Sequence, residues 1–89
     1  MNILSEIEVN AFGLKEWQFS NQTILKTFKF KNFSETFAFM TQVAFLAEKL
    51  DHHPNWNNVY NELNITLFTH THHGVTIKDI ELAKAIDKL

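Results

Sequence analysis

A helical repeat of apolar residues between Phe33 and Leu50 constrains the fold of this chain more than any other feature. Asn32 and, three residues on, Glu35 make a variant of the capping box that starts a helix, and Pro54 forbids helix beyond the repeat. The apolar residues form two adjacent stripes, which predicts a helix covered by a sheet and also by something else. The stripes are Phe33, Phe37, Met40, Ala44, Ala47 and Leu50, and beside them Phe39, Val43 and Leu46.

Segments on both sides of this helix alternate between apolar and polar residues, as half-buried strands do. We predict a short strand at 17–20, a turn at 20–22 and a longer strand at 23–31. Alternation resumes at 59–67, with Val59, Leu63, Ile65 and Leu67 expected on the buried face, and an irregularity at 61–64 leaves open whether this is one strand or two. If the strand runs further, it places three more side chains on the face of Thr66: Phe68, His70 and His72.

Two further helices complete the pattern. A short one is predicted at 2–9, and a longer one begins at the capping box of Thr76 and Asp79. Its apolar face comprises Ile77, Ile80, Ala83 and Ile86. Strands, helix, strands, helix is the order of an α+β domain, so we expect residues 1–89 to be a single domain with a four-stranded antiparallel sheet and its helices on one face.

Composition narrows the class of protein. The chain has 89 residues, of which 45% are hydrophobic and nine are Phe, which favours a packed core over disorder. The net charge of −2 gives no reason to expect nucleic acid, and the absence of cysteine excludes disulfides. No apolar run is long enough to span a membrane and no signal peptide is visible, so we expect a cytoplasmic protein.

The residues that carry chemistry cluster after the long helix. Adjacent imidazoles at His52 and His53 can exchange protons near neutral pH. They belong to a longer pattern: Glu48, then His52-His53-Pro54, Tyr60, His70 and Asp79. This interlocked pattern resembles that of the pterin-4a-carbinolamine dehydratase family, which is known in animals also as a dimerisation cofactor of a homeodomain transcription factor. The resemblance extends over residues 17–87.

The resemblance implies dehydration of 4a-hydroxytetrahydrobiopterin to quinonoid dihydropterin and water. It implies that His52 and His70 form the acid/base pair and that His53 holds the pterin. The reaction includes no redox step, so we expect no cofactor. The family also implies a homodimer or homotetramer, and a functional link through tetrahydropterin recycling to an aromatic amino-acid hydroxylase.

Further residues receive supporting roles. Trp17 would supply an aromatic wall for the flat pterin, and Asp51 or Glu48 would orient an imidazole through its second nitrogen. Asp79 is assigned to the start of the last helix and kept out of catalysis. Phe68 stands where relatives commonly have a small hydroxyl residue. The lysines of the 23–31 strand are interpreted as a solvated face: Lys26, Lys29 and Lys31.

Two other classes of function stay open. One is a non-catalytic dimerisation or protein-binding module, against which the complete set of histidines argues. The other is a metal-binding protein, since the chain has five histidines, and His70 and His72 on one strand face would suit an ion. Adjacent histidines rarely chelate one ion and no HExxH spacing is present, so we expect no metal and expect His72 and His73 to be dispensable.

Overall fold

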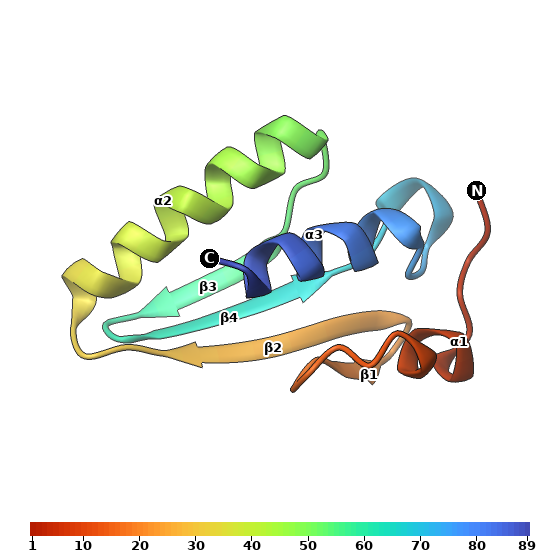
Figure 1. The fold of residues 1–89 in the computed structure, drawn as a ribbon, viewed down its shortest axis with the longest axis horizontal. Helices are drawn as coiled ribbons and strands as arrows, with labels where there is room; N and C mark the ends of the chain where they lie inside the picture. The colour runs from red at the N-terminus through yellow and green to blue at the C-terminus, as the bar shows by residue number, and fades with distance from the viewer.

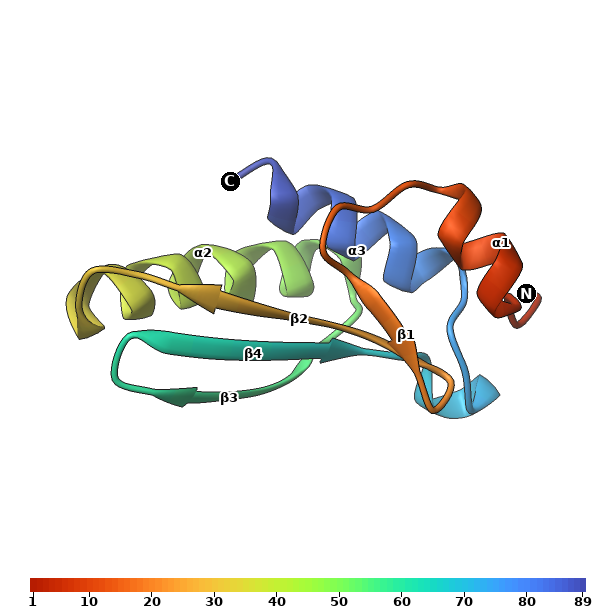
Figure 2. The same cartoon turned by 90° about the horizontal axis from the view of Figure 1, so that it is seen from below.

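Four strands form one antiparallel sheet in the order β1-β2-β4-β3 in the computed structural model, which describes residues 1–89. Helices α2 and α3 lie on the same face of this sheet (Figure 1, Figure 2). The predicted α+β class and its one-sided helical layer are therefore confirmed. The elements are α1 (Glu6–Ala11), β1 (Gln18–Ser20), β2 (Thr23–Lys29), α2 (Phe33–Leu50), β3 (Asn55–Val59), β4 (Glu62–Leu67), the 3₁₀ turn η1 (His70–His72) and α3 (Ile77–Asp87).

The core lies between the sheet and the two long helices. Strand β4 is central, and its alternate residues Leu63, Ile65 and Leu67 are fully buried. They form one buried cluster with Val43 of α2 and with a set from α3 that includes Leu82 as well as the predicted Ile80, Ala83 and Ile86. Ile77 is 40% exposed, so it does not belong to this set. None of the helices combines the length and the hydropathy that a membrane-spanning helix requires.

The irregularity predicted at 61–64 is the turn of a β-hairpin. Strands β3 and β4 pair with Val59 opposite Glu62, which places the break at Tyr60 and Asn61. Tyr60 adopts a left-handed conformation with φ of 50°. The turn shifts the alternation, so Val59 faces solvent and is 73% exposed. The prediction that Val59 lies on the same buried face as Leu63, Ile65 and Leu67 is wrong.

The two apolar stripes of α2 have different surroundings. In the stripe of Phe39, Val43 and Leu46, Val43 is buried and the other two are half-buried against the core. In the other stripe Phe33 and Phe37 lie on the outer side, 48% and 55% exposed, and Ala47 is the one buried member. Phe45 belongs to neither stripe and is 72% exposed on the outer side. A single chain therefore covers α2 on the sheet side only, and the second cover expected from the sequence is not supplied by the chain itself.

Lys26 corrects the prediction of a solvated lysine face. It lies on β2 opposite Ile65, on the core side of the sheet, and its side chain is only 14% exposed. Its Nζ lies 3.0 Å from Asp87 Oδ1 and packs over the rings of Trp17 and Phe28. The long aliphatic stem explains this placement, because a lysine can bury its methylenes while its charge finds a partner at the edge.

The N-terminal helix begins later than its pattern suggests. Ser5 caps α1 and forms a capping box with Glu8, so the helix covers 6–11 where 2–9 is predicted. The residues before Ser5 lie outside the helix, and the Leu4 amide donates a 2.7 Å hydrogen bond to the Val75 carbonyl. The cap determines the start because its hydroxyl satisfies an amide that would otherwise lack a partner.

The turn between β1 and β2 gives the first testable prediction. Ser20 pairs with Thr23, and the two residues between them, Asn21 and Gln22, have φ of 49° and 61°. Glycine adopts this left-handed region without the steric cost that a Cβ brings. Gln22→Gly should raise the free energy of unfolding by about 0.5–1 kcal/mol, measured by urea denaturation. Gln22→Ala keeps the Cβ and should give no gain; equal gains for both variants would contradict the explanation.

Candidate active site

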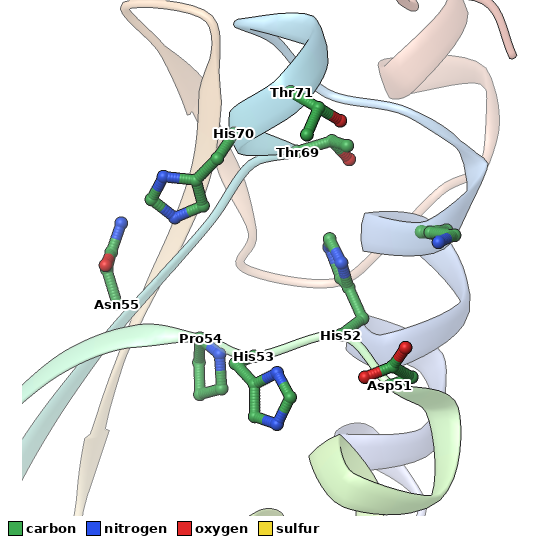
Figure 3. Close-up of a pocket in the computed structure, with 9 residues that line it drawn as sticks. Asp51, His52, His53, Pro54, Asn55, Thr69, His70 and Thr71 are labelled. Carbon is green, nitrogen blue, oxygen red and sulfur yellow. The ribbon is translucent and has the colours of Figure 1, made fainter.

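A pocket of about 330 Å³ opens where the segment after α2 meets the segment after β4 (Figure 3). Its size lies within the range of small-molecule sites. Of the residues proposed from the sequence, it brings together His52, His53, His70 and Asp51. Its full lining is Asp51, His52, His53, Pro54, Asn55, Thr69, His70, Thr71 and Lys78.

The end of α2 aims the two adjacent histidines in different directions. The helix ends at Leu50, and Asp51 turns the chain with a left-handed φ of 50°. The His52 amide then donates back to the Ala47 carbonyl at 3.0 Å, and the Asp51 amide to Glu48 at 3.2 Å, which is the Schellman arrangement. This turn ends the helix before Pro54 is reached. The local cause of termination is therefore Asp51.

His52 points inward and is 9% exposed. Its Nε2 lies 2.5 Å from Oδ1 of Asp79, a carboxylate that is fully buried. The other oxygen, Oδ2, accepts hydrogen bonds of 2.9 Å from the Thr69 hydroxyl and from the Thr76 amide. The Thr76 hydroxyl lies 2.6 Å from that of Thr69 and extends the network. Every polar atom of the buried carboxylate thus has a partner, as burial of a charge requires.

This network determines which nitrogen of His52 is available for chemistry. An ionised carboxylate can only accept hydrogen bonds, so Nε2 carries the proton that it donates to Asp79. Nδ1 is then the free nitrogen of the neutral ring. No buried side-chain nitrogen or oxygen in the structure lacks a hydrogen-bond partner. Since Nδ1 has none, it must be in contact with the solvent of the pocket.

His53 has a carboxylate partner of its own. Its Nε2 lies 2.5 Å from Oε2 of Glu48, one turn back on α2, and both side chains are largely exposed. Glu48 therefore contacts an imidazole through one ring nitrogen, as the sequence interpretation allowed for Glu48 or Asp51. Asp51 lines the pocket and makes no side-chain hydrogen bond.

His70 comes from the opposite wall of the pocket and corrects the predicted strand. Strand β4 ends at Leu67, and Thr69 forms an isolated bridge with Gly74. His70 to His72 then make the 3₁₀ turn η1. His70 and His72 do not share a strand face, so the spacing that would have suited a metal does not exist. No group of three or more histidine, aspartate or glutamate side chains is close enough to hold an ion.

The histidines next to Gly74 lie apart from the pocket lining. His73 is exposed and has a left-handed φ of 57°. His72 is half-buried, and its Nδ1 is 2.9 Å from the Thr71 hydroxyl. The expectation that a turn holds both in solvent describes His73 well and His72 only in part.

Trp17 lies outside this pocket. Its side chain is 8% exposed in the core, where Nε1 donates a 2.9 Å hydrogen bond to Asp87 Oδ2 and the ring meets Phe28 edge-on. It is absent from the pocket lining, so within a single chain no contact supports its expected role as an aromatic wall.

Sequence reasoning missed three contributors to the site. The sequence assigns Asp79 only to the start of a helix. In the structure one of its oxygens caps α3 and the other contacts His52. Its place in the interlocked pattern was the available signal. Thr69 bonds this carboxylate and Lys78 adds a cation to the lining. Nothing in their spacing distinguished these two from ordinary polar residues.

Comparison with known proteins agrees with this geometry. A family model for pterin 4 alpha carbinolamine dehydratase matches residues 3–89. A protein of Prochlorococcus marinus, named as a candidate pterin-4-alpha-carbinolamine dehydratase, is 58% identical over 91 residues, covering 100% of this chain and 96% of its own length.

Two solved structures share the fold. One, described as a transcriptional coactivator/pterin dehydratase from Brucella melitensis, is 46% identical with a TM-score of 0.92, covering 98% of this chain and 97% of that one. The other is a pterin dehydratase-like protein described as a RuBisCO assembly factor in the alpha-carboxysome. It is 29% identical with a TM-score of 0.69, covering 82% of this chain and 87% of that one. With its sequence matched almost from end to end, the chain belongs to the pterin-4a-carbinolamine dehydratase family.

Proposed function

We propose that this protein dehydrates a 4a-hydroxytetrahydropterin to the quinonoid dihydropterin and water. The observation that carries the proposal is the convergence of three imidazoles on one pocket, with His52 held by a buried carboxylate. Membership of the dehydratase family supports the same reaction. The pocket volume of about 330 Å³ is sufficient for a bicyclic ring.

The chemistry requires one proton donor and one proton acceptor. The bond from C4a to its hydroxyl breaks, and the departing oxygen takes a proton and leaves as water. The lone pair of N5 forms the new C=N bond, and N5 loses its proton. Nothing is oxidised or reduced, and the N5 lone pair stabilises the developing cation at C4a. Imidazole suits both proton transfers near neutral pH.

His52 and His70 are assigned to these transfers. In the neutral ring of His52, the unprotonated Nδ1 is fixed by the bond from Nε2 to Asp79, which makes His52 suited to accept a proton. His70 reaches the pocket from η1 on the other wall and is suited to donate one to the hydroxyl. The donor and the acceptor come from separate segments, so a substrate can lie between them.

His53 is assigned to substrate binding. Glu48 engages its Nε2 and leaves the other nitrogen free for the pterin. The side chain is 56% exposed, which fits a contact at the pocket entrance better than proton transfer in its interior.

A non-catalytic role is the second candidate, because the pterin dehydratase-like relative of 29% identity is described as an assembly factor. Turnover distinguishes the two: a binding module would not accelerate the dehydration above its uncatalysed rate.

We also infer that the protein self-associates through the outer face of α2. Phe33, Phe37 and Phe45 are 48%, 55% and 72% exposed on this face. A groove of about 170 Å³ is lined by Phe37, Met40, Thr41 and Ala44 of α2 and by Trp56 of the edge strand β3. An apolar surface of this kind marks an interaction site, and a second copy of so small a chain would supply the cover that α2 lacks.

The acid/base assignment predicts a loss of turnover. His52→Ala and His70→Ala should each lower kcat by about 10²–10⁴-fold, the usual contribution of a general acid or base. His53→Ala should raise KM more than it lowers kcat. The matched control is His72→Ala/His73→Ala, which removes two imidazoles outside the pocket and should keep wild-type turnover. If both single variants stay folded and fully active, the assignment is wrong.

The buried carboxylate predicts a combined effect on activity and stability. Asp79→Asn replaces one carboxylate oxygen by an NH₂ group, which must face either His52 Nε2 or the Thr76 amide, both of them donors, so kcat should fall by at least about 10²-fold. The loss of charge-assisted hydrogen bonds should lower the free energy of unfolding by about 1–3 kcal/mol. Steady-state kinetics and urea denaturation measure the two effects. Asp87→Asn, on the same helix but outside the pocket, should leave kcat unchanged. An Asp79→Asn protein with wild-type kcat would refute the role given to this carboxylate.

Self-association predicts a mass above that of one chain. Analytical ultracentrifugation at micromolar concentration should show a species of at least twice 10.4 kDa. Phe37→Glu/Phe45→Glu should shift it toward the monomer, because charges on the outer face of α2 oppose burial. Lys84→Glu on the exposed side of α3 is the control and should not. A wild-type protein that sediments only as a monomer would remove the inference.

A further inference from the structure

We propose that Phe68 is a positioning residue that holds the imidazole of His70 in its catalytic orientation. This inference rests on the proposed function, in which His70 is one of the two proton-transfer groups. Phe68 does not line the pocket, so any effect on the reaction must act through His70.

The three imidazoles of the pocket are held in different ways. His52 and His53 each contact a carboxylate through Nε2. The ring of His70 makes no hydrogen bond to any protein group, and it packs instead on Phe68, with ring centroids 4.2 Å apart and planes inclined at 40°. Phe68 is therefore the aromatic contact that distinguishes His70 from the other two.

Backbone hydrogen bonds fix the main-chain position of His70 but not the orientation of its ring. The Thr69 amide donates a 2.8 Å hydrogen bond to the Gly74 carbonyl. Within η1, the His72 amide donates to the Thr69 carbonyl at 3.0 Å and the His73 amide to the His70 carbonyl at 3.3 Å. These bonds fix the position of the Cα atom. The two side-chain torsions stay free for an exposed residue. A contact on one face of the ring is needed to favour one rotamer.

The same segment explains why Phe68 is available for this contact. Thr69 is buried and directs its hydroxyl to Asp79. Thr69 is in extended conformation, with φ of −95° and ψ of 107°, so the side chains before and after it leave on the side away from the Thr69 hydroxyl. The Phe68 and His70 rings are in contact there. The residue that completes the Asp79 network thereby also brings the Phe68 and His70 rings together.

An aromatic partner suits a proton-transfer group in a way that a carboxylate does not. A carboxylate occupies one ring nitrogen, as Asp79 does with His52. The Phe68 ring has no hydrogen-bonding atom, so it orients His70 while leaving both nitrogens free. Tilted aromatic pairs favour their own geometry by an energy equivalent to about a two- to tenfold change in rotamer population.

The experiment compares variants of Phe68 in the full chain. Phe68→Leu keeps an apolar side chain but removes the aromatic face, and should lower kcat by about two- to tenfold with little change in KM. Phe68→Tyr keeps an aromatic ring at this position and should have wild-type kcat. Phe12→Leu removes a ring far from the pocket and is the control. NMR of the His70 ring protons in the free protein gives a readout independent of activity. The ring-current shift of these protons should be lost in Phe68→Leu and kept in Phe68→Tyr.

The outcomes separate this inference from the proposed function. An active wild-type protein with a ring-current shift that disappears in Phe68→Leu while kcat stays unchanged would overturn the positioning role alone. An effect of Phe68→Leu on KM but not on kcat would do the same. A wild-type protein without dehydratase activity would overturn the proposed function, and the positioning role with it, whatever the NMR shifts show.

Discussion

The buried carboxylate of Asp79 is the interaction on which the rest of the site depends. It accepts hydrogen bonds from the Thr69 hydroxyl, in the segment after β4, and from the Thr76 amide, at the start of α3. It also contacts His52, in the segment after α2. Three segments are thus joined at one side chain, and that of His52 is the one distant in sequence, 27 residues from Asp79. Because a buried charge left without partners is costly, these segments are held together and the pocket keeps its shape.

Much of the fold could be predicted because its signals are local. The capping residues Asn32 and Thr76 start α2 and α3 where expected, since a side-chain cap needs only its nearest neighbours. The positions that went wrong depend on tertiary context. Val59 belongs to a different strand from Leu63, and Lys26 is drawn to the core side by Asp87, which lies 61 residues away in sequence.

The site residues also divide into those that could be predicted from the sequence and those that depend on the tertiary structure. The imidazoles of His52, His53 and His70 were identifiable from residue type and interval, and the pocket unites them. The partner of His52 was assigned differently: Asp79 stands in the interlocked pattern, but a carboxylate that caps a helix has the same local sequence whether or not it also contacts an imidazole. Trp17 shows what interval alone leaves out: the family interval assigns this aromatic residue to the ligand, whereas within a single chain its ring is buried in the core and its Nε1 donates to Asp87.

The most direct test of this account is the tautomer of His52, measured by long-range ¹H–¹⁵N correlation in alkaline solution, where histidine rings are neutral. If Asp79 is the acceptor that organises the site, Nε2 carries the proton and Nδ1 is bare. A ring protonated on Nδ1 would mean that Asp79 does not accept from Nε2. The site would then lack the proton acceptor on which the proposed dehydration depends.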